Sequence, residues 1–318
     1  HISRHGADGE PSTICTQALR YGMGVERRWI GAIRQCTARG KCRFTACLPV
    51  RFVDRSAVLP AGLVMRLTSP GADHRPCAIR RLQGGGRSVL LGSKTGPDLP
   101  CHLYLPNKPH PQGRVLVSVH GVSRNAEEHL ELFKSHAEHY GVLLAAPVFA
   151  ADRFRDFQRL GRKGRGPRAD LALIRLLNAL SRATGWDTSK VDMFGFSGGA
   201  QFAHRFALAH PQRVRRLVLG AAGWYTMPDD SLAYPYGTAD ASGLDAARLN
   251  TLAAARLPTL VLVGERDNRD DDEELNRSEI VCGSQGDTRL QRAQAWTRAM
   301  NAFAADRGEP AASALVTL

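Results

Sequence analysis

Ser197 lies in the pattern Gly195-x-Ser197-x-Gly199, within the stretch VDMFGFSGGAQFAHRFA. This spacing is typical of a serine nucleophile that attacks a carbonyl carbon from a sharp turn between a strand and a helix. A β-rich run, KVDMFG, leads directly into the pattern, and the apolar-striped run AQFAHRFALA follows it without a loop. The alternative is that Ser197 only caps the helix. A cap of this kind does not require a strand directly before it. We therefore predict that Ser197 is a catalytic nucleophile.

The glycines around the serine have a physical role in such a turn. The turn strains the serine backbone and brings neighbouring chain close, so positions without a Cβ are needed on either side. We expect Gly195 and Gly199 to fill these positions. The helix that begins at Gly198 is expected to point the positive end of its dipole at the serine.

Strands and helices alternate on both sides of this turn. A hairpin is expected from SVLLG and CHLYLP, followed by buried strands at 114–119, 141–148, 190–195, 215–220 and 258–264 and a terminal strand over 311–318. Helices are expected at 125–140, 170–183, from 198 onward and at about 287–307. In the first of these, Leu130, Phe133, Ala137 and Tyr140 form the apolar stripe, and Asp170 suits the first turn of the second. This alternation predicts an α/β fold, with a mostly parallel sheet covered by helices on both faces.

From about residue 86 onward the sequence resembles the α/β-hydrolase superfamily. The resemblance rests on VHGVSRNAEEH after an early strand, DTSKVDMFGFSGGAQFAHRFALAHPQRV around Ser197, and LVLVGERD after a late strand, in that order. Within the superfamily the chain is similar to the serine esterases related to polyhydroxyalkanoate depolymerases and feruloyl esterases. The resemblance implies the α/β-hydrolase fold and cleavage of a small-molecule or polymeric carboxylic ester through an acyl-enzyme on Ser197. It implies neither a cofactor nor a metal.

The same resemblance implies an oxyanion hole made of two backbone N–H groups. One belongs to Gly198, directly after the nucleophile, and the other to the loop HGV, where Val122 is expected and Gly121 is the alternative. Fixed N–H dipoles stabilise the charge of a tetrahedral intermediate and are each worth roughly 100- to 1,000-fold in rate. His120 is expected to support this loop rather than to transfer protons.

The resemblance also implies a triad acid after a late strand. The run GERD places Asp267 there, with Asp270 as the alternative, to hold a histidine in the correct tautomer and stabilise its charged form. Trp224 and Tyr225 belong to a long insertion at 223–250, and we expect them either to line a substrate pocket or to pack as ordinary loop residues. The arginine-rich loop at 152–168 is expected to be solvated, with attraction of an anionic ester as the alternative.

The histidine of the triad is absent from this sequence. All 11 histidines lie at or before His210, whereas the family position follows the last strand. His204 lies on the same helix as Ser197 and about 10 Å further along its axis, too far for a general base, which must come within about 3 Å. We expect the chain to be a fragment that stops a few residues before its histidine and is nearly inert by itself. The alternatives are a catalytically inactive α/β-hydrolase that acts as a binding protein, and a serine peptidase or thioesterase of the same fold.

The net charge of +13 is concentrated near the start of the chain. Residues 1–84 hold 14 Lys and Arg against 5 Asp and Glu and show no sustained periodicity. We predict a basic, poorly ordered or non-native extension there, and a hydrolase domain at 85–318. Aromatic residues do not alternate with the basic ones, so no nucleic-acid partner is expected. No apolar run approaches the roughly 20 residues of a membrane span, and no signal peptide is visible, which favours the cytoplasm. The sequence leaves the oligomeric state open.

Overall fold

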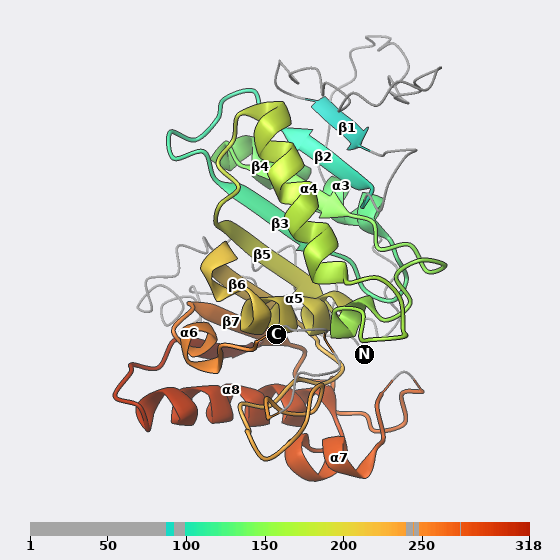
Figure 1. The fold of residues 1–318 in the computed structure, drawn as a ribbon, viewed down its shortest axis with the longest axis vertical. Helices are drawn as coiled ribbons and strands as arrows, with labels where there is room; N and C mark the ends of the chain where they lie inside the picture. The colour runs from blue at the N-terminus through green and yellow to red at the C-terminus, as the bar shows by residue number, and fades with distance from the viewer. Residues whose placement is uncertain (1–86, 92–98, 240–243, 245–247, 274) are drawn as a thin grey trace, which may run out of the picture.

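An eight-stranded sheet forms the centre of the part of the chain that the structure, a computed structural model, describes. The described residues are 87–91, 99–239, 244, 248–273 and 275–318, so the predicted extension at 1–84 lies outside them. The strands lie in the order β1-β2-β4-β3-β5-β6-β7-β8 (Figure 1). Their bounds are β1 (Arg87–Leu91), β2 (Cys101–Leu105), β3 (Val115–Val119), β4 (Leu143–Pro147), β5 (Val191–Phe196), β6 (Val214–Gly220), β7 (Thr259–Val263) and β8 (Ser313–Thr317).

Strand direction divides the sheet into two parts. β1 is antiparallel to β2, and β2 is antiparallel to β4, whereas every neighbouring pair from β4 to β8 is parallel. The antiparallel pairing of β1 and β2 confirms the predicted hairpin, and the parallel part confirms the predicted sheet. Because parallel strands end at the same edge of a sheet, the segments that follow β3 to β7 gather there.

Helices cover both faces of the sheet. α3 (Ala126–Tyr140) packs against one face, with Phe133 in the same apolar cluster as Phe194 of β5. α4 (Ala169–Thr184), α5 (Gly198–Ala209) and α8 (Arg289–Ala305) belong to the larger cluster on the other face. The shorter elements are η1 (Phe157–Arg159), η2 (Pro211–Arg213), α6 (Thr251–Ala255) and α7 (Glu279–Gln285). None of the helices in the described ranges is long and apolar enough to cross a membrane.

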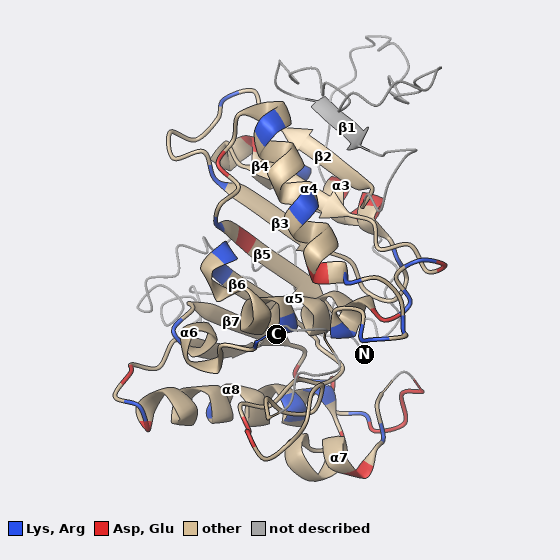
Figure 2. Ribbon diagram, in the orientation of Figure 1, with Lys and Arg blue, Asp and Glu red and all other residues tan. Residues whose placement is uncertain are grey.

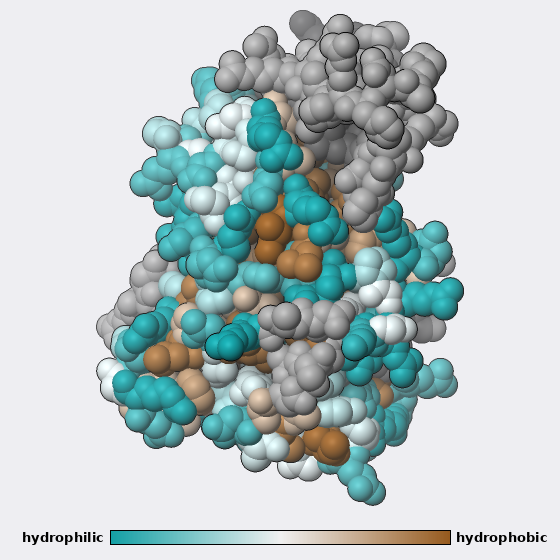
Figure 3. Space-filling view, viewed as in Figure 1, coloured by the Kyte–Doolittle hydropathy of each residue, from teal (hydrophilic) through white to brown (hydrophobic). Residues whose placement is uncertain are grey.

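The view in Figure 3 shows a largely hydrophilic surface with small apolar patches over α4 and α7. These two helices carry Leu171 and Ile280, which are among the exposed large apolar side chains. Small scattered patches of this kind are normal on a folded domain and indicate no binding surface.

Particular residues set the helix ends. Gly141 ends α3 with a left-handed φ of 62°, and its N–H donates to Glu138 O at 3.2 Å. Thr288 begins α8 with a capping box that it shares with Gln291. The stripe predicted for α3 needs one correction, because Tyr140 is partly exposed and His129 is buried in its place.

The carboxyl edge of the parallel strands carries unusual backbone geometry. Among the described residues other than glycine, positive φ angles occur at Arg124 (60°), Leu160 (62°), Ser197 (51°) and Ala221 (46°). Each of these residues lies in the segment that follows β3, β4, β5 or β6. Residues in such sparsely populated conformations cluster at functional sites. This edge is therefore the candidate site.

Candidate active site

Ser197 connects β5 directly to α5, with φ of 51° and ψ of −114°. Two backbone hydrogen bonds hold this conformation. The Ser197 N–H donates to Gly220 O of β6 at 2.8 Å, and the Ser197 carbonyl accepts from Gln201 N–H at 3.1 Å. A non-glycine residue in such a conformation carries strain of about 1–3 kcal/mol. The side chain is half-buried at the carboxyl edge of the sheet.

The glycines on either side of Ser197 have no room for a side chain. A Cβ on Gly195 would lie 2.3 Å from Gly199 O, and a Cβ on Gly199 would lie 2.1 Å from Val119 O and 2.5 Å from His120 O. The obstructing atoms all belong to backbone, which cannot rotate away. Glycine at these two positions therefore allows α5 to approach the end of β3.

Val122 and Gly198 lie next to each other beside the serine. A Cβ on Gly198 would be 3.3 Å from Val122 N, and a Cβ on Gly121 would be 3.5 Å from Ser197 Cβ. Within the described ranges, the Val122 N–H has no protein acceptor. Gly198 is the first residue of α5, and the N–H groups of the first turn of a helix have no acceptor within the helix. The N–H of Gly121, the alternative donor, also has no protein acceptor within the described ranges, and the Gly121 carbonyl accepts from Arg124 N–H at 3.2 Å. The Val122 and Gly198 N–H groups could thus bind one oxygen together.

His120 supports the loop after β3. Its ring is fully buried, and Nε2 accepts the Phe149 N–H at 3.0 Å. Nδ1 must therefore carry the proton, which it donates to Gly121 O at 2.8 Å. Burial lowers the pKa of His120 to about 4, so the ring is neutral at pH 7. With both nitrogens bonded, this histidine positions the backbone of the loop and has no free nitrogen for proton transfer.

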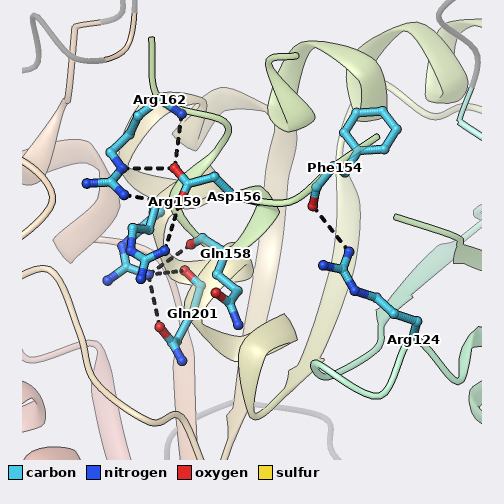
Figure 4. Close-up of polar contacts among 8 residues, drawn as sticks. Arg124, Phe154, Asp156, Gln158, Arg159, Arg162 and Gln201 are labelled. Carbon is cyan, nitrogen blue, oxygen red and sulfur yellow. Dashed lines mark hydrogen bonds and ion pairs between the residues drawn. The ribbon is translucent and has the colours of Figure 1, made fainter. Parts of the chain in front are cut away.

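Arg124 ties the same loop to the segment after β4. Its guanidinium donates to the carbonyl of Phe149 and to that of Phe154, the latter contact shown in Figure 4, and lies 4.4 Å from the centre of the Phe157 ring. Burial lowers the pKa of Arg124. No local sequence pattern indicates this role of Arg124, because its partners lie more than 20 residues away along the chain.

Arg205 makes a second connection, from inside α5. It is fully buried, and its guanidinium donates to Thr226 Oγ1 at 2.9 Å, to Gln158 O at 2.8 Å and to Gln201 O at 3.2 Å. It also lies 4.2 Å from the centre of the Trp224 ring. Burial lowers the pKa of Arg205 to about 9. An arginine within the apolar run AQFAHRFALA is the sequence signal that could have revealed it.

The arginine-rich loop at 152–168 is solvated only in part, because Arg155, Lys163 and Arg165 are exposed whereas other residues of the loop pack into the core. Phe154, Phe157 and Leu160 are buried in the core, and Asp156 is only 5% exposed. Arg159 and Arg162 donate to the Asp156 carboxylate at 2.6 and 2.8 Å (Figure 4), and these contacts hold the pKa of that carboxyl below its usual value against the opposing effect of burial. Apolar side chains interspersed among the arginines were the signal that the loop packs.

Asp267 follows β7 at the same edge of the sheet. Its carboxylate accepts from Arg289 of α8 at 3.2 Å, and its N–H closes a turn onto Gly264 O at 3.1 Å. Asp267 is partly buried, whereas the alternative, Asp270, is exposed. β6 alone separates β5 from β7, so Ser197 and Asp267 follow strands about 10 Å apart. Leu318 lies beside this turn, because its carbonyl accepts the Glu265 N–H at 2.9 Å.

No histidine of the described residues is hydrogen-bonded to Ser197, and several are bonded elsewhere. His204 is fully engaged, with Nδ1 on Ala200 O and Nε2 on Thr226 N, both at 2.9 Å. His129 is buried against Ser118. The geometry therefore assigns none of them to the serine.

Trp224 and Tyr225 are both buried. Tyr225 is fully enclosed and stacks on Trp296 of α8 at 5.0 Å between ring centres. The guanidinium groups of Arg205 and Arg159 lie 4.2 and 5.7 Å from the centre of the Trp224 ring. The contacts of Trp224 and of Tyr225 are those of ordinary packed side chains. The described residues contain no cluster of His, Cys, Asp and Glu side chains that could hold a metal ion.

The chain is similar in sequence and in structure to several known proteins. No family model matches it. Feruloyl esterase B from Talaromyces funiculosus is 26% identical over 146 residues, which is 45% of this chain and 40% of that protein, so the alignment spans less than half of the relative. Among solved structures, poly(aspartic acid) hydrolase-1 from Sphingomonas sp. KT-1 is 26% identical, with a TM-score of 0.63 over 74% of this chain and 92% of that one.

The poly(3-hydroxybutyrate) depolymerase of Bordetella parapertussis has the same fold. It matches with a TM-score of 0.60 and 24% identity over 74% of this chain and 84% of its own. The fold expected from the sequence is thereby confirmed. The sheet topology and these similarities together show that the chain has the α/β-hydrolase fold and is similar to esterases of that fold.

Proposed function

We propose that the chain belongs to an enzyme that hydrolyses carboxylic esters through an acyl-enzyme on Ser197. The observation that carries this proposal is the grouping of the strained Ser197 with the N–H groups of Gly198 and Val122. Such a site holds a nucleophile and the donors for a developing oxyanion on one edge of the sheet. The similarity to a feruloyl esterase supports an ester as the substrate.

The reaction has two steps. Ser197 Oγ bonds to the ester carbonyl carbon while a base accepts its proton, and the carbonyl oxygen becomes an oxyanion bound by the Gly198 and Val122 N–H groups. The intermediate collapses by breaking the bond to the alcohol oxygen, which takes the proton from the base. Water then attacks the acyl-enzyme in the same way and releases the carboxylic acid and free Ser197.

The base in this proposal is a histidine that residues 1–318 do not contain. The support is that His120 and His204 have both ring nitrogens bonded and that no described histidine bonds to Ser197. Asp267 would orient this histidine. Loss of the base lowers kcat by about a million-fold in a well-measured serine hydrolase, so residues 1–318 alone should turn over esters very slowly.

Labelling with a fluorophosphonate tests the nucleophile directly. Ser197 Oγ displaces fluoride from phosphorus, and the adduct is seen as an increase in intact mass. We expect slow labelling of the chain, faster labelling when imidazole is added as a free base, and complete loss of labelling in Ser197→Ala. Ser123→Ala is the matched control, because Ser123 is an exposed serine on the neighbouring loop, and it should label like the parent chain.

Two results would contradict the proposal. Labelling that survives in Ser197→Ala would place the nucleophile elsewhere. Rapid labelling without imidazole would show that a base within residues 1–318 reaches the serine.

A second candidate function is hydrolysis of an anionic polyamide. It is favoured by the similarity to a poly(aspartic acid) hydrolase, together with the exposed basic side chains of Arg153, Arg155, Lys163 and Arg165 after β4. Figure 2 shows basic residues along the segment between β4 and α4. If this candidate holds, poly(aspartic acid) should slow the labelling of Ser197, and an uncharged polymer of equal length should not. Equal labelling rates with both polymers would remove this candidate.

A further inference from the structure

Gln158 lies beside the two backbone N–H groups assigned to the oxyanion. It belongs to η1, in the segment after β4, whereas Val122 follows β3 and Gly198 begins α5. A Cβ on Gly198 would lie 2.9 Å from Gln158 Nε2 and 3.3 Å from Val122 N. Three nitrogens from three different segments are therefore grouped around one point next to the nucleophile.

The backbone of Gln158 is fixed by a contact on its other side. Its carbonyl accepts from the buried Arg205 at 2.8 Å, and both flanking residues are also held. Phe157 is fully buried, and Arg159 donates to Asp156. Figure 4 shows the side chain of Gln158 extending away from the pair formed by Asp156 and Arg162.

The Gln158 side-chain amide has no hydrogen-bond partner among the described residues, and the residue is only half-buried. A carboxamide carries two N–H donors and one acceptor, so it can give a hydrogen bond to a substrate oxygen. Being uncharged, it can stand next to the serine without changing the charge of the site.

We propose that Gln158 Nε2 is a third donor to the oxyanion, beside the N–H groups of Gly198 and Val122. This inference rests on the proposed function, because it assumes that the acyl group is bound to Ser197. A donor that faces the developing charge acts mainly in the transition state, so its loss lowers the rate of the chemical step more than substrate binding. Removing a single side-chain donor of this type lowers the rate by about 100-fold.

The test is the rate of phosphonylation of Ser197 in the presence of imidazole. The negative oxygen of the phosphonate occupies the place of the oxyanion. We expect Gln158→Leu to lower the maximal labelling rate by about 100-fold while the reagent concentration for half-maximal rate changes little. Gln158→Glu, which keeps the shape but replaces the donor by a charge, should label no faster than Gln158→Leu. Gln112→Leu, in an exposed loop away from the site, should label like the parent chain.

The outcomes separate this inference from the proposed function. Ser197-dependent labelling of the parent chain with an equal rate in Gln158→Leu would overturn the role of Gln158 alone. A change only in the half-maximal concentration would do the same, because it would assign Gln158 to ground-state binding. Absence of Ser197-dependent labelling in the parent chain would overturn the proposed function and this inference with it.

Thermal unfolding and an adduct structure complete the test. Because Arg205 holds the Gln158 backbone and not its side chain, Gln158→Leu should unfold at the same temperature as the parent chain. In a crystal structure of the phosphonylated chain, the phosphonyl oxygen should lie within about 3.2 Å of Gln158 Nε2. A longer separation would overturn the inference.

Discussion

Gly199→Ala should remove a large part of the stability of the chain. The new Cβ would lie 2.1 Å from Val119 O and 2.5 Å from His120 O, so β3 and α5 would have to separate. Forced overpacking of this kind destabilises by about 3 kcal/mol or more, out of a typical total of roughly 5–15 kcal/mol. Unfolding in urea, followed by circular dichroism, measures the change.

A second glycine provides the matched control for this substitution. Gly283 lies in α7, and a Cβ there would meet no atom within 4 Å. Gly283→Ala should leave the chain as stable as before, or stabilise it by up to about 1 kcal/mol, because alanine favours a helix. Equal urea midpoints for the two alanine variants would mean that the turn at Ser197 can open to accept a side chain.

Acid should destabilise the chain before its carboxylates are protonated. Burial lowers the pKa of His120 to about 4 and of His129 to about 3, and it also lowers that of His204. Below pH 6.5 the unfolded chain binds protons at these positions, whereas the folded chain does not. Their contribution to stability is therefore complete above pH 6.5 and is lost as the pH falls toward 4 and then 3. The largest losses are roughly 3 kcal/mol for His120 and 5 kcal/mol for His129.

Urea unfolding at a series of pH values between 7 and 4 measures this loss. His129→Gln keeps a neutral polar side chain and should make the fall in stability with decreasing pH less steep. The explanation fails if the free energy of unfolding stays constant down to pH 4, or if His129→Gln follows the same curve as the parent chain.

Much of the fold could be predicted because buried parallel strands leave a clear signal. The runs at 114–119, 190–195 and 258–264 are apolar and short, and each lies within a residue or so of an observed strand. The turn at Ser197 could also be predicted, because its close backbone contacts require glycine at positions 195 and 199 and the sequence has glycine at both. α6 and α7, by contrast, have five and seven residues, too few for helical periodicity to show.

Other features depend on contacts that no local pattern contains. Gln158 meets Gly198 only because η1 folds back over α5, and its sequence neighbours give no sign of this. Asp170 lies in the first turn of α4, as predicted, but no local pattern indicated that it is fully buried and binds Arg168 and His210 at 2.6 and 2.7 Å. His129 takes a core position because Ser118 offers it a hydrogen bond at 2.9 Å. Such roles follow from the tertiary arrangement.

The half-buried Arg124 and the buried Arg205 also bear on how a substrate would bind. Arg124 joins the loop after β3 to the segment after β4, and Arg205 joins that segment to α5. The three segments that carry the proposed oxyanion donors, which are the loop after β3, the segment after β4 and the start of α5, are therefore connected before any ligand binds. A site built in this way needs no induced fit, because its dipoles are oriented in advance and do not reorganise during the reaction. Covalent inhibitors should accordingly react in a single exponential phase, without a slow isomerisation that precedes bond formation.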